Sequence, residues 1–206
     1  MHDPQTLPDG LPVPTDDGGA SHLLHAAVAD VSLVCTSGET VRLRTVCERP
    51  TVLFFFPRTG VPGQPPGPGF EGESWDQIPG ARGCTPQSCG FRDLYEQIAA
   101  TGVQLLGLST QTSEFQSEFK RRNRVTFDYL SDSDLRLATA MRLPIFEFPI
   151  ASGGPNRLFK RMAWFVDQNQ IQHLWYPVFP PDQNAAQVLG WLTTTRRRAS
   201  PTPCRD

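Results

Sequence analysis

The residues of this chain best placed for chemistry are two cysteines in the stretch Gly83–Cys89, GCTPQSC. Thr85 is a favourable helix N-cap and Pro86 suits the first helical position, so we expect a helix to begin here with Cys84 at its N-terminal end. Unpaired backbone N–H groups and the positive end of the helix dipole lie at such an end, and both favour a thiolate. In general, helix N-termini lower the pKa of a cysteine from ~8.5 to roughly 3.5–7.5. The sequence therefore predicts a nucleophilic sulfur at Cys84.

The second cysteine, Cys89, follows five residues later in the same predicted helix. Along an α-helix this spacing gives a rise of about 7.5 Å and a rotation of about 140°. The two Cα atoms are then roughly 8–9 Å apart, beyond the ~7 Å limit for a disulfide. A bond between the two sulfurs therefore requires the first turn of the helix to unwind.

The segments on either side of this stretch are predicted to be a buried strand and a helix. Val52–Phe56 is short, bulky and apolar, which is typical of a buried strand. After Cys89, apolar residues at 91, 94, 95 and 98 have helical spacing, and Gly102 ends the helix predicted over 86–101. The continuous apolar run 103–109 suits a parallel strand that is covered on both faces.

The complete order of predicted elements indicates an α/β protein with a thioredoxin-like fold, in which helices flank a mixed central sheet. An N-terminal hairpin extension turns at Ser37–Gly38, so that Cys35 pairs with Thr40, and Cys35 and Cys47 are expected to be small buried residues. Asp132 or Ser133 caps the third helix, and Asp182 caps the last one. The predicted elements are the hairpin 31–44, strands 51–56, 103–109, 126–130, 161–166 and 171–176, and helices 86–101, 113–122, 135–141 and 182–193.

Three segments lie outside this pattern. Residues 1–28 are rich in Pro, Asp and Gly and are expected to wrap the surface or to be partly disordered. The domain proper covers 29–193 and contains a long Pro/Gly-rich insertion at 58–80, which is expected to lack regular structure and to pack Trp75 and Ile78 beside the site. A disordered tail is expected over 194–206.

Composition argues against several classes of protein. The chain has 206 residues, a net charge of −2 and no basic footprint for nucleic acid beyond Arg196–Arg198 near the end. The N-terminus lacks the pattern of a signal peptide, and no apolar run approaches the ~18 residues of a membrane span. The five cysteines and four scattered histidines include no zinc-like spacing, so we expect neither metal nor cofactor. We expect a cytoplasmic protein, in a compartment where a disulfide is more often catalytic than structural.

At several points the chain resembles the peroxiredoxins, most closely the Q subgroup, the bacterioferritin comigratory proteins. The resemblance covers roughly residues 30–193, and the most specific part is Gly-Cys-Thr-x-x-x-Cys-x-x-Arg-Asp. The motifs that carry it are Phe54–Pro57 (FFFP), Pro79–Asp93 (PGARGCTPQSCGFRD), Leu106–Ser109 (LGLS) and Leu130–Asp134 (LSDSD).

This resemblance implies a thiol peroxidase that reduces hydrogen peroxide and organic hydroperoxides. Cys84 matches the peroxidatic cysteine, which becomes a sulfenic acid, and Cys89 matches the resolving cysteine, which condenses with it to an intramolecular disulfide. Thioredoxin or a similar dithiol then reduces that disulfide. We expect a monomer or a weak dimer.

The resemblance also assigns residues around the sulfur. Arg161 matches an arginine that stabilises the thiolate and holds the peroxide oxygens, and Pro57 matches the family's proline. Ala81 stands where the family has a threonine, so another hydroxyl must serve the peroxide. Thr85 and Thr59 are the two candidates, and we favour Thr59 because Thr85 is expected to cap the helix.

Two other functions are compatible with a thioredoxin-like fold. A dithiol oxidoreductase or redox sensor that acts on protein thiols typically has Cys-x-x-Cys at the helix start, whereas this chain has Cys-x4-Cys. A non-enzymatic interaction module could use the Pro-rich insertion as its ligand. Cys204 in the tail is an alternative, less favoured resolving thiol.

Overall fold

A mixed sheet of seven strands forms the centre of the computed structural model, which describes residues 6–60, 73–148 and 156–199. Strands β3, β4 and β5 are parallel to one another, while β1 and β8 run antiparallel to their neighbours. This arrangement confirms the predicted α/β class and mixed sheet. The spatial order is β2 (Thr40–Arg42), β1 (Ser32–Cys35), β5 (Asp128–Ser131), β4 (Gln104–Ser109), β3 (Thr51–Phe55), β8 (Met162–Asp167) and β9 (Gln170–Trp175).

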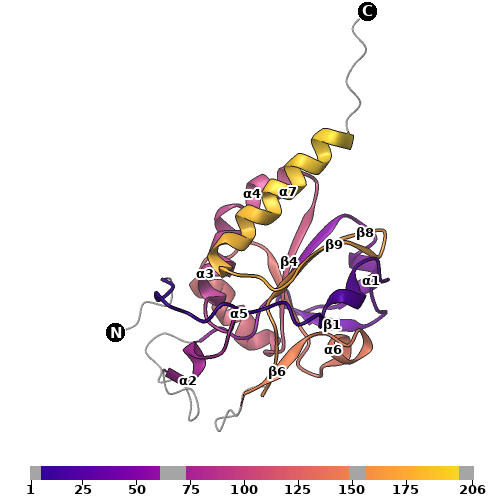
Figure 1. Ribbon diagram of the computed structural model, residues 1–206. Coiled ribbons are helices and arrows are strands. Elements are labelled where there is room, and N and C mark those ends of the chain that lie inside the picture. The colour runs from indigo at the N-terminus through magenta and orange to yellow at the C-terminus, as the bar shows by residue number, and fades with distance from the viewer. Residues whose placement is uncertain (1–5, 61–72, 149–155, 200–206) are drawn as a thin grey trace, which may run out of the picture.

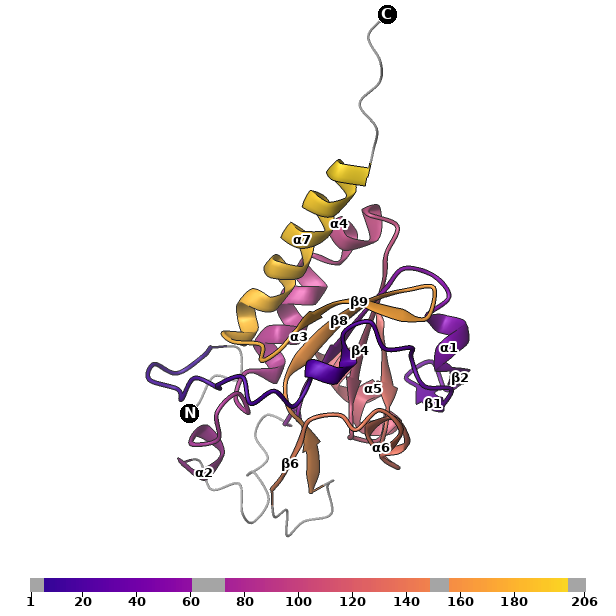
Figure 2. The same cartoon turned by 45° about the vertical axis from the view of Figure 1, so that its right-hand side comes forward.

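Helices cover both faces of the sheet (Figures 1 and 2). One face packs against α3 (Cys84–Asp93), α4 (Tyr95–Ala100), α5 (Ser113–Arg122) and α7 (Asn184–Ala199). The other packs against α1 (Leu43–Val46), α6 (Arg136–Ala140) and the 3-10 turn η1 (Ser21–Leu23). Strand β3 is buried on both faces because Val52 and Phe54 point into the first core while Leu53 and Phe55 point into the second.

A small second sheet and a short helix lie outside the seven-stranded sheet. Strands β6 (Ile145–Glu147) and β7 (Arg157–Phe159) pair antiparallel, where the sequence suggested a loop from Phe146. Helix α2 (Glu73–Asp76) lies in the insertion that was expected to be irregular. As predicted, Trp75 packs toward the site: it is buried with Ala81, and Ile78 packs against the same cluster. Residues 61–72 and 149–155 lie outside the described part of the chain.

The hairpin is shifted by one residue from its predicted register. Val34, not Cys35, lies opposite Thr40, and the Cys35 N–H donates to the Glu39 carbonyl at 2.7 Å. The reason is a three-residue loop with Gly38 at φ 91°, instead of a two-residue turn. The second strand also ends early, since α1 begins at Leu43. The burial of Cys35 and Cys47 is confirmed, and burial raises the pKa of Cys47 to about 12.

Both ends of the described chain are more ordered than the sequence suggested. Residues 6–28 wrap the surface and cross from the start of α3 toward β1 (Figure 1), with Ala20 and Leu23 buried. The Asp17 carboxylate accepts hydrogen bonds from Lys160 at 2.6 Å and Tyr176 at 2.7 Å. Helix α7, preceded by η2 (Pro181–Gln183), continues to Ala199, beyond the predicted end at Thr193. Residues 1–5 and 200–206, including Cys204, lie outside the described part. None of the helices in the described ranges has the length and apolar character needed to cross a membrane.

Candidate active site

The position of Cys84 is fixed by a sharp turn at Gly83. Gly83 is the N-cap of α3 with φ 101° and ψ 21°, so the helix begins at Cys84 itself. A Cβ atom at this position would lie 2.3 Å from Pro181 Cγ and 2.8 Å from Leu7 Cδ2, so only glycine fits here. The predicted cap at Thr85 is therefore wrong by two residues, because a tertiary contact, not a side-chain cap, starts the helix.

The Cys84 sulfur lies among hydrogen-bond donors. Arg161 Nη2 donates to Sγ at 3.2 Å, and the backbone N–H of Arg58 donates to it at 3.4 Å. As a thiol, the sulfur can itself donate to the Ala81 carbonyl, 3.7 Å away. Cys84 and Arg161 are only 4% and 3% exposed, so these contacts are shielded from water. Two donors aimed at one buried sulfur suit a thiolate better than a neutral thiol.

Arg161 is held by the turn that precedes α3. Its Nε donates to the Gly80 carbonyl at 3.3 Å, and its Nη2 donates to the Ala81 and Arg82 carbonyls at 3.1 Å each. Its Nη1 donates to Gln87 Oε1, one turn into the helix. Among the described residues, these partners are neutral oxygens and the Cys84 sulfur. A buried guanidinium needs a compensating charge, and a Cys84 thiolate would supply it. The sequence predicted that Arg161 lies beside Cys84, and the structure brings them together.

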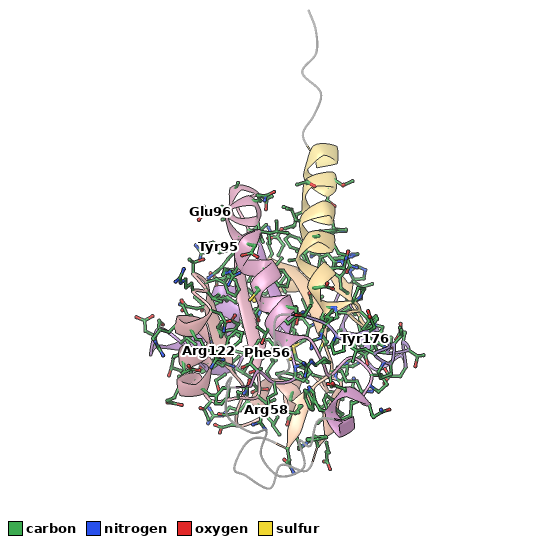
Figure 3. All side chains as sticks on the ribbon, turned by 90° about the vertical axis from the view of Figure 1, so that its left-hand side faces the viewer. Phe56, Arg58, Tyr95, Glu96, Arg122 and Tyr176 are labelled. Carbon is green, nitrogen blue, oxygen red and sulfur yellow. The ribbon has the colours of Figure 1, made fainter. Side chains whose placement is uncertain are left out.

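Residues 57–59 follow the end of β3 and contact the site through the backbone of Arg58. Pro57 is buried, and Arg58 follows it with its N–H on the sulfur. Figure 3 shows Phe56 and Arg58 below the N-terminal end of α3, with Arg122 on one side and Tyr176 on the other. Burial lowers the pKa of the Arg58 guanidinium, and its attraction to the Cys84 sulfur opposes that shift. Sequence reasoning missed Arg58, although its place directly after Pro57 could have suggested it.

Thr59 has a different partner from the one its predicted role would require. Its hydroxyl donates to Gln111 Oε1 at 3.2 Å, and both residues are 2% exposed. The hydroxyl oxygen keeps lone pairs, so contact with a bound peroxide stays a prediction. Ala81 is fully buried, and its carbonyl, not its side chain, serves the site by accepting from Arg161. Gln111 is a second residue that sequence reasoning missed, because no local pattern links it to Thr59.

Gln87 connects the site to the last helix. It accepts from Arg161, and its Nε2 donates to Asn184 Oδ1 at 2.9 Å. Gln87 and Asn184 are both fully buried, and Asn184 is the first residue of α7. The residue that orients Arg161 thus lies between the two cysteines and is anchored to a helix about 100 residues away in the sequence.

Cys89 lies in the same intact helix as Cys84, and both are free thiols. It is 9% exposed, and burial raises its pKa, an effect that Arg92 opposes and Asp93 reinforces. Helical geometry over five residues separates the two Cα atoms by roughly 8–9 Å. Helix α3 ends at Asp93, and Leu94 separates it from α4, whereas the sequence predicted one continuous helix. The helix that must unwind for a disulfide is therefore short.

The chain is similar in sequence to proteins of one family. The profile of the family described as Redoxin matches residues 23–189. Peroxiredoxin Q, chloroplastic, from Oryza sativa subsp. japonica is 26% identical over 165 residues, which is 80% of this chain and 64% of that protein. Peroxiredoxin bcp1 from Schizosaccharomyces pombe is 30% identical over 132 residues, 63% of this chain and 57% of that protein. The chain therefore spans less than two thirds of the length of these two relatives.

The fold has close counterparts among solved structures. The crystal structure of peroxidoxin BcpB from Mycobacterium tuberculosis matches with a TM-score of 0.62 and 24% identity, over 83% of this chain and 96% of that one. These similarities confirm the predicted resemblance to the peroxiredoxin Q group. By its profile match over residues 23–189, the chain belongs to the Redoxin family.

Proposed function

We propose that this protein is a thiol peroxidase with Cys84 as the peroxidatic residue. The observation that carries the proposal is the buried Cys84 sulfur with the Arg161 guanidinium at 3.2 Å and the Arg58 N–H at 3.4 Å. The thiolate attacks one peroxide oxygen, so the S–O bond forms as the O–O bond breaks. The sulfur is oxidised to a sulfenic acid, and the leaving oxygen takes a proton and departs as water or an alcohol. Hydrogen peroxide and organic hydroperoxides are the proposed substrates.

The surrounding residues have separate roles in this step. Arg161 stabilises the thiolate and offers fixed donors to the charge that develops on the leaving oxygen. Pro57 has a fixed φ and no N–H, so it sets the direction of the chain into Arg58. The Thr59 hydroxyl donates its hydrogen bond to Gln111 Oε1, so its oxygen would accept a hydrogen bond from the peroxide. That contact matters because an unpaired polar group in a buried pocket costs about 1–3 kcal/mol.

Cys89 is the proposed resolving residue. Its sulfur attacks the sulfenic sulfur of Cys84, the S–S bond forms, and the S–O bond breaks to release water. The first turns of α3 must open for this to happen, because the intact helix keeps the two residues too far apart. A dithiol such as thioredoxin then supplies two electrons and returns both thiols by exchange. Both cysteines lie in one helix of one chain, so the cycle needs no second subunit, and we expect a monomer or weak dimer in a reducing compartment such as the cytoplasm.

Stopped-flow oxidation of Cys84 by hydrogen peroxide tests the proposal directly. We expect second-order oxidation far faster than that of a free cysteine, followed by a slower phase of disulfide formation. A Cys84 that reacts no faster than a free cysteine would exclude a peroxidase. If such a protein instead exchanged disulfides rapidly with protein thiols, it would be a dithiol oxidoreductase.

A further inference from the structure

The side chain of Gln111 pairs with the backbone of Thr59. Gln111 Oε1 accepts from the Thr59 N–H at 2.9 Å, and Gln111 Nε2 donates to the Thr59 carbonyl at 3.0 Å. The same Oε1 accepts from the Thr59 hydroxyl at 3.2 Å. One amide therefore satisfies both backbone groups of one buried residue, as a neighbouring strand would. This pairing holds the chain at a point where the sheet no longer does.

The segment that Gln111 holds is also the segment that contacts the Cys84 sulfur. Strand β3 ends at Phe55, and the Phe56 N–H makes the next bond, to the Leu108 carbonyl at 3.1 Å. Two residues later the Arg58 N–H donates to Cys84 Sγ. The direction of that N–H depends on where residues 56 and 59 are held, since they lie on either side of the Pro57–Arg58 pair. Gln111 fixes the position of residue 59.

Gln111 is itself held rigidly. Its N–H donates to Ser109 Oγ at 3.2 Å, and its carbonyl accepts from Ser131 Oγ at 2.7 Å. Ser109 and Ser131 end the parallel strands β4 and β5, so the backbone of Gln111 is fixed to the sheet. A second contact supports the same stretch, because Arg122 Nη2 donates to the Gly60 carbonyl at 2.8 Å while Glu118 holds Arg122. Figure 3 shows Arg122 and Arg58 in the lower part of the view, where Phe56 is also labelled.

We propose that Gln111 is a positioning residue that holds the Arg58 N–H on the Cys84 sulfur and thereby stabilises the thiolate. The proposal rests on the proposed function, in which Cys84 is the reactive sulfur, but it concerns the thiolate and not the peroxide. Gln111 acts through Thr59 and Arg58. Its loss leaves Arg161 as the remaining fixed donor to the sulfur, so the thiolate has fewer fixed hydrogen bonds and the sulfur reacts more slowly.

The test compares Gln111→Met with the matched control Gln116→Met. Gln116 is also a buried amide, 1% exposed, and it donates to Ser109 Oγ at 2.7 Å and the Leu130 carbonyl at 3.2 Å. It shares Ser109 with the Gln111 backbone, but neither of its hydrogen bonds involves residues 57–60, so this control leaves the pairing of Gln111 with Thr59 in place. Both substitutions keep the length of the side chain and remove its hydrogen bonds. Two rates are measured in the full chain at pH 7. One is the rate of alkylation of Cys84 by iodoacetamide, which peptide mass spectrometry monitors. The other is the rate of oxidation of Cys84 by hydrogen peroxide.

We expect Gln111→Met to lower both rates by about five- to tenfold, since a hydrogen bond to a charged group is among the stronger kinds. Gln116→Met should change both rates by less than about twofold at a similar loss of thermal stability. Unchanged alkylation in Gln111→Met, or equal losses in the two variants, would overturn the proposal. Gln111→Asn retains the amide but withdraws it from Thr59, and gives the same result if Gln111→Met does not fold. Alkylation needs no peroxide, so a failure of the proposed peroxidase leaves this test intact.

Discussion

Gln87, which lies between the two cysteines in α3, donates a hydrogen bond to Asn184 at the start of α7, at 2.9 Å. Gln87 also accepts from Arg161, so one buried side chain joins α3, the arginine beside the sulfur, and the last helix. Opening of α3 therefore breaks contacts well beyond the two cysteines.

The first prediction concerns this opening. Formation of a Cys84–Cys89 disulfide should unwind residues 85–90 and release the Gln87–Asn184 hydrogen bond, because the intact helix holds the sulfurs apart. Oxidised protein should lose helical circular dichroism. Its amide exchange should become faster at 85–93 and also at the start of α7. An oxidised structure that contains both the disulfide and an intact α3 would contradict this account.

The second prediction concerns the nucleophile. Cys84→Ser should lose essentially all peroxidase turnover and remain folded, because serine neither ionises at neutral pH nor is oxidised to a sulfenic acid. The control is Cys47→Ala, since Cys47 is fully buried with a pKa raised to about 12 and should be inert. Turnover measured with a thioredoxin system should be unchanged in the control. Substantial turnover in Cys84→Ser would remove Cys84 from the chemistry.

The third prediction separates resolution from attack. Cys89→Ser should react with one equivalent of peroxide at the wild-type rate and then stall, because nothing captures the sulfenic acid. With excess peroxide, mass spectrometry should show further oxygens added at Cys84. Normal cycling of this variant with thioredoxin would mean that another thiol, such as Cys204, is the resolving residue.

The fourth prediction tests the hydroxyl of Thr59. Thr59→Val keeps the shape and the backbone pairing with Gln111 but removes the oxygen proposed to accept from the peroxide. The rate of Cys84 oxidation should fall by about tenfold, which corresponds to ~1.4 kcal/mol of transition-state stabilisation. Alkylation by iodoacetamide should be nearly unchanged, in contrast to Gln111→Met. Equal peroxide rates in Thr59→Val and the wild type would leave the threonine with an anchoring role alone.

The parts of the structure that follow local patterns could be predicted from the sequence. Periodicity and turn residues are local signals, so they predicted three of the central elements. These are the apolar strand β3, the parallel strand β4 and the helix that contains Cys84 and Cys89. The start of α3 was not predicted, because it depends on Pro181 and Leu7, which are distant in the sequence and leave room only for glycine at position 83.

The polar contacts of the site could not be predicted for the same reason. The partners Thr59 and Gln111 are 52 residues apart, and Gln87 and Asn184 are 97 apart. A glutamine has the same local preferences whether it is buried against a backbone or exposed. The end of α7 was missed for a different reason. The polar residues from Thr194 onward resemble a disordered tail, but the helix continues through them to Ala199, and the Thr194 hydroxyl donates to the Gly190 carbonyl.

The contacts at Gly83 also bear on how long the oxidised sulfur persists. Two residues distant in the sequence pack against the turn at Gly83. Leu7 belongs to a segment before the Redoxin match, and Pro181 lies just before the last helix. Motion of Gly83 during the unwinding of α3 would break these contacts, so we expect the opening rate to depend on Leu7 and Pro181. A sulfenic acid in a slowly opening helix has a longer lifetime, and a second peroxide competes better with Cys89 for it. Shortening the N-terminal segment should therefore shift this competition toward the disulfide and make the protein harder to inactivate with excess peroxide.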